Sequence, residues 1–161
     1  MIFWRLEYPR HSDDALSGEG ARRYGGRWNV KGTAAVYLSS CLSLAALEKF
    51  VHAQPMARGL ALRAIAVNVP DDCIRHALRP DPLPAGWQQP EPRVDSMHWG
   101  SEWATSRKSL AAAVPSVLLP LHFFEKELEF NLMLNPDHPD MKREQVTARM
   151  EYAFDSRLWK G

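Results

Sequence analysis

The sequence predicts an α+β fold with mostly antiparallel sheets. Six short stretches have the length and residue pattern of strands, beginning with residues 2–8 and ending with residues 146–154. Only two segments have the features of a helix of more than two turns, one running to about residue 52 and one over residues 101–112. Many strands joined by few helices are typical of this class. The length of 161 residues fits a single domain, expected over 1–161.

The first half of the chain alternates between strands and loops. Residues 2–8 place Ile2, Trp4, Leu6 and Tyr8 on one side, as a half-buried strand does. A glycine-rich stretch over 11–32 is expected to be a loop. Residues 33–39 predict a short buried strand. The serines at 39, 40 and 43 then offer caps for a helix, and residues 60–69 predict another strand.

The second half begins with an irregular connection. Five prolines over residues 80–92 fix the backbone and remove amide donors, yet neither flank looks complete enough to make this a domain linker. After the helix over 101–112, the apolar run 114–119 predicts a buried strand. Residues 127–134 and 146–154 alternate clearly and predict two more strands.

Composition excludes several classes of function. Lys plus Arg is 20 and Asp plus Glu is 19, so the net charge of +1 gives no broad basic field for nucleic acid or anionic lipid. Cys41 and Cys73 form no CxxC pair and the six histidines form no HExxH pattern, so neither a metal site nor a disulfide is expected. Without a signal peptide pattern or a membrane span, we expect a cytoplasmic protein.

Glu48 is the first candidate functional residue. It falls inside an apolar helix stripe formed by Leu44, Leu47 and Val51. A carboxylate on a face that packs against the core costs free energy unless it is paired or used in chemistry. A structural ion pair, or a side chain that reaches solvent from the edge of the stripe, would explain it equally well.

The segment GGRWN, residues 25–29, is the second candidate. Its two glycines let the backbone pass close to a ligand, and the guanidinium of Arg27 suits phosphate oxygens. Lys31 adds positive charge nearby. The segment is neither a GxGxxG fingerprint nor a P-loop, so a tight surface turn with solvated arginines is the alternative.

Three further polar residues lie in predicted strands. Tyr37 could stack on a flat ring, or it could be a core aromatic whose hydroxyl is bonded. Ser116 lies in an apolar run, where a buried hydroxyl needs a partner or a ligand, but it lacks the GxSxG elbow of a hydrolase nucleophile. Asn131 lies on the polar face of the 127–134 strand, and an exposed strand face would account for it.

Taken together, these segments resemble the RES domain family, named for Arg, Glu and Ser. The resemblance is carried, in order along nearly the whole chain, by the following stretches: SGEGARRYGGRWNVKGTAAVYLSSCLSLAALEKFVH (17–52), GSEWATS (100–106), AVPSVLLP (113–120), FNLMLNPDHPD (130–140) and FDSRLW (154–159).

The resemblance implies a fold like that of ADP-ribosyltransferases, with two small sheets flanking an NAD⁺ cleft. It implies a catalytic set of Arg27, Tyr37, Glu48 and Ser116, with Lys31 and Asn131 as further contacts to NAD⁺. Glu48 would stabilise the positive charge that develops when the bond between nicotinamide and ribose breaks. Arg27 would hold the pyrophosphate. No metal and no cofactor beyond NAD⁺ as substrate are implied.

The activity implied is that of the toxin of a type II toxin–antitoxin system, which depletes NAD⁺ by hydrolysis or phosphorolysis. The expected partner is an Xre-like helix-turn-helix antitoxin that contacts DNA in place of this chain, and the toxin could form a homodimer within that complex. A protein ADP-ribosyltransferase and a scaffold that only binds its partner are the alternatives, because fold alone does not choose the acceptor. A ribonuclease would need a basic groove or a histidine acid–base pair, and the sequence supplies neither clearly.

Overall fold

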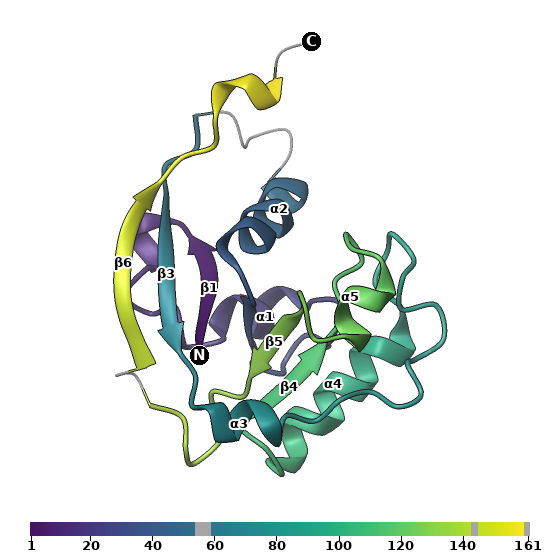
Figure 1. Ribbon diagram of the computed structural model, residues 1–161. Coiled ribbons are helices and arrows are strands. Elements are labelled where there is room, and N and C mark those ends of the chain that lie inside the picture. Colours follow the sequence, from purple (N-terminus) through teal and green to yellow (C-terminus); the bar gives the residue numbers. More distant parts are fainter. Residues whose placement is uncertain (54–58, 143–144, 160–161) are drawn as a thin grey trace.

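The computed structural model describes residues 1–53, 59–142 and 145–159 (Figure 1). The strands are β1 (Ile2–Glu7), β2 (Val36–Ser39), β3 (Leu62–Asn68), β4 (Ala111–Val114), β5 (Asn131–Leu134) and β6 (Val146–Tyr152). The α-helices are α1 (Glu19–Tyr24), α2 (Leu42–Ala53), α3 (Asp71–Arg75), α4 (Val94–Ser106) and α5 (Leu121–Glu125), and 3-10 helices cover Pro9–His11 and Ser156–Trp159.

The described strands form one six-stranded sheet in the order β4-β5-β2-β1-β3-β6, and every neighbouring pair is antiparallel. The α+β class is therefore confirmed, but the expected pair of separate sheets is not what the structure has. Two three-stranded halves meet where β1 and β2 share a single register position, Trp4 opposite Ser39. Figure 1 shows β5 and β4 diverging from β1, β3 and β6 beyond that junction.

Strand β1 lies inside the sheet and is covered on both faces. Phe3 is fully buried in the main core cluster, while Leu6, whose side chain points to the opposite face, is buried in a second cluster. The sequence pattern placed only the even-numbered residues in the core. Phe3 was missed because a strand covered on both faces does not need to alternate in hydrophobicity.

Two predicted elements lie at other positions. The strand expected over 114–119 is β4, which ends at Val114 because Pro115 has no amide hydrogen to continue the ladder. The helix expected over 101–112 is α4, which begins at Val94 and ends at Ser106. The glycine-rich loop over 11–32 also contains α1, whereas residues 80–92 contain no helix or strand, as predicted.

Strand β5 begins four residues later than its pattern indicated. Leu128 is exposed, and Glu127 has a left-handed backbone with φ of 55°. This turn follows α5 directly, and it brings the chain into β5 at Asn131. The alternation of residues 127–134 therefore covers a turn as well as a strand, and only its second half is paired in the sheet.

Helix α4 packs directly on the backbone of the GGRWN segment. A side chain added at Gly100 would place its Cβ 1.8 Å from the carbonyl oxygen of Trp28, so only glycine allows this approach. Trp28 is buried between Trp87, with ring centroids 6.5 Å apart, and Trp99, at 5.6 Å. These contacts fix the position of Arg27, the residue just before Trp28.

Candidate active site

Glu48 lies on the packed face of α2, but not for the reason that the sequence suggested. The helix buries Leu44 and Ala45, whereas Leu47 and Val51 are exposed, so the predicted stripe was wrong. Glu48 follows Leu44 by four residues and Ala45 by three, which places all three on one side of the helix. Its carboxylate is thus directed toward the sheet rather than toward solvent.

Two side chains from the sheet half β4-β5-β2 bind the same oxygen of Glu48. The hydroxyl of Ser116 donates to Oε1 at 2.8 Å, and Nδ2 of Asn131 donates to Oε1 at 2.6 Å. Among the described residues, none forms a hydrogen bond with Oε2. The carboxylate is therefore held in one orientation by one oxygen while the other remains available to a ligand.

Ser116 is held as firmly as the carboxylate it contacts. It lies two residues after the end of β4, it is 3% exposed, and its Oγ accepts a hydrogen bond from the amide of Leu118 at 3.1 Å. Its only donor is used on Glu48. The predicted need of this buried hydroxyl for a partner is confirmed, and the partner is Glu48.

The guanidinium of Arg27 is bound by a loop. Nη1 donates to the carbonyl oxygens of Trp87 and Gln89, both at 2.8 Å, and Nη2 donates to that of Pro90 at 2.9 Å. We call residues 80–92, which hold five prolines and include these three carbonyl groups, the proline-rich loop. Burial lowers the pKa of Arg27 below its ordinary value, and the negative charge of Glu48 acts against that shift. Arg27 therefore lies within electrostatic range of Glu48 while it fastens this loop.

Tyr37 belongs to the framework under the GGRWN segment. Its hydroxyl donates to Oδ1 of Asn29 at 2.7 Å and accepts from the amide of Trp28 at 3.1 Å. Burial raises the pKa of Tyr37 well above its ordinary value, so the hydroxyl stays protonated. A Cβ at Gly26 would lie 2.9 Å from this hydroxyl, which explains the need for glycine there. The bonded core tyrosine considered from the sequence is what these contacts describe.

The remaining predicted residues divide between the cluster and the surface. Asn131 is the first residue of β5 and belongs to the cluster. Lys31 is exposed, and no described hydrogen bond or ion pair joins its ammonium group to Glu48, Ser116 or Asn131. The structure thus brings together Glu48, Ser116 and Asn131. Arg27 lies within electrostatic range of Glu48, Tyr37 supports the GGRWN segment, and Lys31 lies apart.

Sequence reasoning missed two residues of the framework. Asn29 is fully buried and donates to the carbonyl oxygens of Ala21, Val30 and Thr33. Ser39 is 4% exposed, and its hydroxyl donates to Oδ1 of Asn131 at 2.8 Å. Asn29 stood in a segment already singled out, whereas Ser39 had been assigned only as a helix cap.

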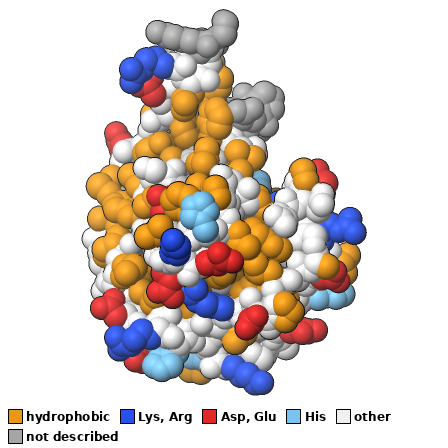
Figure 2. Space-filling model, turned by 45° about the vertical axis from the view of Figure 1, so that its right-hand side comes forward, with side chains coloured by type: hydrophobic (Ala, Val, Ile, Leu, Met, Phe, Trp, Pro, Cys, Tyr) orange, Lys and Arg blue, Asp and Glu red, His pale blue; other side chains and the backbone are white. Residues whose placement is uncertain are grey.

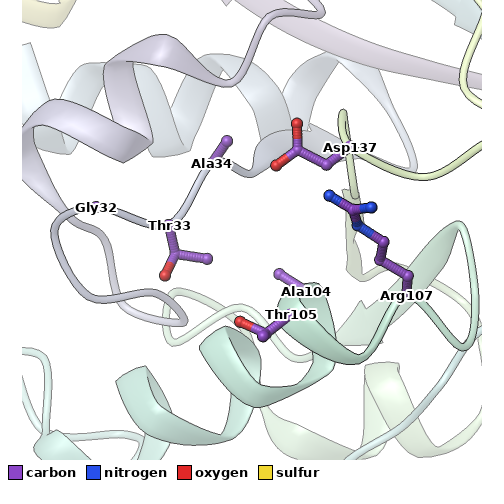
Figure 3. A pocket seen from close by; sticks show the side chains of 7 residues that line it. All are labelled: Gly32, Thr33, Ala34, Ala104, Thr105, Arg107 and Asp137. Carbon is purple, nitrogen blue, oxygen red and sulfur yellow. The ribbon is translucent and has the colours of Figure 1, made fainter.

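The pocket drawn in Figure 3 lies elsewhere. It has a volume of about 320 Å³ and is lined by Gly32, Thr33, Ala34, Ala104, Thr105, Arg107 and Asp137. None of the predicted site residues lines it. Figure 3 shows the side chains of Arg107 and Asp137 on one side and those of two threonines on the other, all on loops or at the end of α4.

The surface charges, the possible metal ligands and the hydropathy of the described helices add little to what the site itself shows. Figure 2 shows one face of the molecule, on which hydrophobic side chains form broad patches and charges of both signs are interspersed. Within residues 1–53, 59–142 and 145–159, no group of three or more His, Cys, Asp or Glu side chains could hold a metal ion. No described helix is both long enough and apolar enough to cross a bilayer.

Comparison with known proteins identifies the family. The model of the RES domain matches residues 2–155, nearly the whole chain. The chain belongs to the RES domain family. Relatives of this RES chain include a protein of Sphingobium sp. (strain YBL2) named "Prs ADP-ribosylating toxin", which is 37% identical over 161 residues, covering 97% of this chain and 95% of the relative.

Two further relatives carry the name "Toxin Res". The one from Yersinia enterocolitica is 36% identical over 159 residues, covering 98% of this chain and 99% of its own. The one from Photorhabdus laumondii is 35% identical over 161 residues, covering 99% and 98%. The resemblance predicted from the sequence is therefore confirmed at the level of the family, and the match extends over whole chains.

Proposed function

We propose that this RES chain is a toxin that breaks the bond between nicotinamide and ribose in NAD⁺. The observation that carries the proposal is the Glu48 carboxylate, held through Oε1 by Ser116 and Asn131 with Oε2 unbonded by described residues. A carboxylate fixed in advance can stabilise positive charge that develops in a transition state without reorganising at that moment. The names of the relatives, which include an ADP-ribosylating toxin, support chemistry on this bond.

The reaction needs one negative group near the ribose. The bond between the ribose C1′ and the nicotinamide nitrogen breaks, and its electron pair leaves with nicotinamide, which departs neutral. An acceptor oxygen then bonds to C1′. A water acceptor gives its proton to solvent, whereas a phosphate oxygen that is already deprotonated has none to lose. Since the ribose ring passes through a state like an oxocarbenium ion, Oε2 of Glu48 would lie against that charge or accept a ribose hydroxyl.

Arg27 would serve the site in two ways. A guanidinium has five N–H donors, and three of them are used on the carbonyl oxygens of the proline-rich loop. The remaining two, on Nε and Nη2, are bonded by no described residue and would bind a pyrophosphate oxygen. Arg27 would then join the loop to the substrate. The sequence alone had suggested only the contact with phosphate.

The other site residues would act mainly through position. The only donor of Ser116 is used on Glu48, so we assign it to the carboxylate rather than to the nicotinamide amide. Asn131 has the same role. Tyr37 would hold the GGRWN segment in place, while the exposed Lys31 would contribute only long-range charge. No metal enters this chemistry.

A second candidate is a protein ADP-ribosyltransferase. The relative named "Prs ADP-ribosylating toxin" favours it, because its 37% identity extends over 97% of this chain. The same residues would break the same bond, and a side chain of a target protein would replace water or phosphate as acceptor. The two functions differ only in what bonds to C1′.

The partner proposed for this toxin is an Xre-like helix-turn-helix antitoxin, in a type II toxin–antitoxin pair in the cytoplasm. The net charge of +1 and the interspersed charges in Figure 2 support a division in which the partner contacts DNA. A homodimer of the toxin within that complex is part of the same proposal.

Incubation of the purified chain with NAD⁺ tests the proposal. We expect release of nicotinamide, with ADP-ribose as co-product in phosphate-free buffer and a phosphorylated ADP-ribose if phosphate is the acceptor. Glu48→Gln should lower the rate about 100-fold or more, since it removes preorganised charge stabilisation. Glu125→Gln, on an exposed carboxylate of α5, is the matched control and should keep full activity.

Three outcomes separate the candidates. Full activity in Glu48→Gln would refute the role of Glu48. Nicotinamide release that appears only when a cell extract is added, with a mass increase of an ADP-ribosyl group on one of its proteins, would favour the protein acceptor. No release under any condition, with the partner still bound, would leave a scaffold that only binds.

A further inference from the structure

Ser39 occupies the only register position at which the two halves of the described sheet meet. Its Cα is paired with that of Trp4 on β1 and with that of Asn131 on β5. Residues directly opposite each other on antiparallel strands have side chains close enough to hydrogen-bond. Ser39 is 4% exposed, so its hydroxyl acts within the protein and not on solvent.

The hydrogen bonds around Asn131 have only one consistent direction. An ionised carboxylate only accepts, so the NH₂ group of Asn131 must face Oε1 of Glu48, at 2.6 Å. The amide oxygen then faces Ser39, whose hydroxyl donates to it at 2.8 Å. If that donor is lost, the Asn131 amide is held only by its bond to Glu48 and is no longer fixed from both ends.

We propose that Ser39 is a positioning residue, which orients the Asn131 amide and through it the Glu48 carboxylate. Its effect on activity rests on the function proposed above, whereas its effect on the Asn131 amide does not. Ser39 touches neither Glu48 nor Ser116 in the described contacts and acts only through Asn131. Because it also pairs with Trp4, the orientation of the carboxylate depends on the junction between the two halves of the sheet.

The direct test is the side-chain amide signal of Asn131 in NMR spectra of the whole chain labelled with ¹⁵N. In the native protein, we expect one Nδ2 proton shifted downfield and slow to exchange, because it is bonded to a carboxylate. Ser39→Ala should move this signal and speed its exchange. Ser40→Ala is the matched control: its hydroxyl accepts the amide of Phe130 instead, so the Asn131 signal should stay. An Asn131 signal unchanged in Ser39→Ala would overturn the proposal.

We call the path from Ser39 through Asn131 to Glu48 the relay. A double-mutant cycle measured on NAD⁺ cleavage tests whether the relay affects activity. Ser39→Ala should lower kcat roughly five- to ten-fold, the effect of about one hydrogen bond, with little change in KM. Ser39→Ala combined with Asn131→Ala should be no slower than Asn131→Ala alone, because Ser39 has no other route to Glu48. Additive losses would overturn the relay.

The NMR and kinetic experiments together distinguish failure of the relay from failure of the proposed function. A native chain that cleaves no NAD⁺, but whose Asn131 signal responds to Ser39→Ala, would refute the proposed function and keep the relay. A native chain that cleaves NAD⁺, but whose Asn131 signal ignores Ser39→Ala, would keep the function and refute the relay.

Discussion

A single buried asparagine holds the GGRWN segment in its shape. Asn29 donates to three carbonyl oxygens of the surrounding chain, and its Oδ1 accepts the hydroxyl of Tyr37. The turn of the chain at Gly26 passes so close to both groups that no side chain fits there. These contacts fix the backbone of the segment, and the position of Arg27 follows from them and from its bonds to the proline-rich loop.

Gly26→Ala tests the framework at the scale of one residue. The added Cβ would lie 2.8 Å from Oδ1 of Asn29 and 2.9 Å from the Tyr37 hydroxyl, so one of these groups must move. We expect a loss of about 1–3 kcal/mol in the free energy of unfolding, typical of overpacking. Urea denaturation followed by circular dichroism measures it.

The control for this change is Gly20→Ala. Gly20 lies in α1 with open space around its Cα, so alanine there should raise the free energy of unfolding by about 0.5–1 kcal/mol through helix propensity alone. Equal stability of the two variants would show that the close approach at Gly26 carries no free energy.

At this scale the sequence predicted identities better than roles. Glu48 and Ser116 stood out because polar groups in apolar surroundings need partners, and each turned out to be the partner of the other. Arg27 was expected to bind phosphate, whereas the fold surrounds it with three carbonyl oxygens from a loop 60 to 63 residues away. The role of Ser39 was hidden because cross-strand register is not visible in one sequence.

Helix α2 is joined to strand β1 by a partly buried charge cluster. Glu7 binds Arg5 at 2.7 Å and Lys49 at 3.7 Å, and Lys49 lies over the ring of Tyr8. Burial alone would raise the pKa of Glu7, but the positive charges of Arg5 and Lys49 outweigh it and hold that pKa below its ordinary value. Lys49 follows Glu48 directly, so this cluster fixes the helix that carries the candidate catalytic group.

The cluster makes stability depend on pH. A carboxyl whose pKa is lower in the folded state stabilises the fold above its unfolded pKa, and this stabilisation is lost as the pH falls through the folded pKa. Native protein should therefore lose stability as the pH falls below about 4.5, the ordinary pKa of a glutamate carboxyl, and on through the lowered pKa of Glu7. In Glu7→Gln that loss should be smaller, as measured by urea midpoints across this range. An identical acid limb in both proteins would contradict the assignment.

The hydrogen bonds from Arg27 hold the proline-rich loop in place. Arg27→Gln removes all three guanidinium bonds, so the amides of Trp87 and Gln89 should exchange hydrogen at least about ten-fold faster, as expected for the loss of several bonds to a charged group. Mass spectrometry of hydrogen exchange measures this without any substrate.

Arg22→Gln provides the comparison for Arg27→Gln. Arg22 is exposed and pairs with Glu19 within α1, so its loss should leave the loop unchanged. Equal exchange of the loop amides in the native protein and in both variants would mean that packing holds the loop and that the bonds of Arg27 do not.

The elements whose bounds were predicted well are those with a clear hydrophobic pattern or a proline near their end. The strands near residues 2–8 and 146–154 and the helix before residue 53 were found close to their expected bounds. Short helices such as α3 and α5 escaped prediction because five residues carry too little periodicity. Helix α4 begins about two turns earlier than predicted because those turns lie outside the apolar pattern.

The main core cluster spans both halves of the sheet, although the sheet is narrow in the middle. The main core cluster contains Phe3 of β1 and Ile65 of β3 from one half, together with Val36 of β2 and Leu132 of β5 from the other. The two halves of the sheet are therefore joined mainly by packed side chains and only weakly by backbone hydrogen bonds. A cooperative unit follows from shared burial more than from strand pairing.

This arrangement predicts a single unfolding transition. Trp28, Trp87, Trp99 and Trp103 pack in the half around α4, so tryptophan fluorescence reports mainly on that half, whereas far-UV circular dichroism reports on both. The two urea transitions should coincide. Fluorescence that changes before circular dichroism would indicate that the halves unfold separately at the Trp4–Ser39 junction.

The fold class could be predicted at this scale, but the number of sheets could not. Alternating strands indicate antiparallel pairing, while the difference between two sheets and one sheet with a narrow junction rests on a single register position. The family resemblance supplied the site residues in order along the chain, and the geometry among them came only with the fold.

The contact between Gly100 and Trp28 has a consequence for genetics. In a selection for cells that survive expression of this chain, two kinds of mutation should accumulate. Changes at Glu48 would leave the protein at full abundance in surviving cells. Any replacement of Gly100 would force α4 off the backbone of Trp28, and its product should be missing from immunoblots because proteases remove chains that fail to fold.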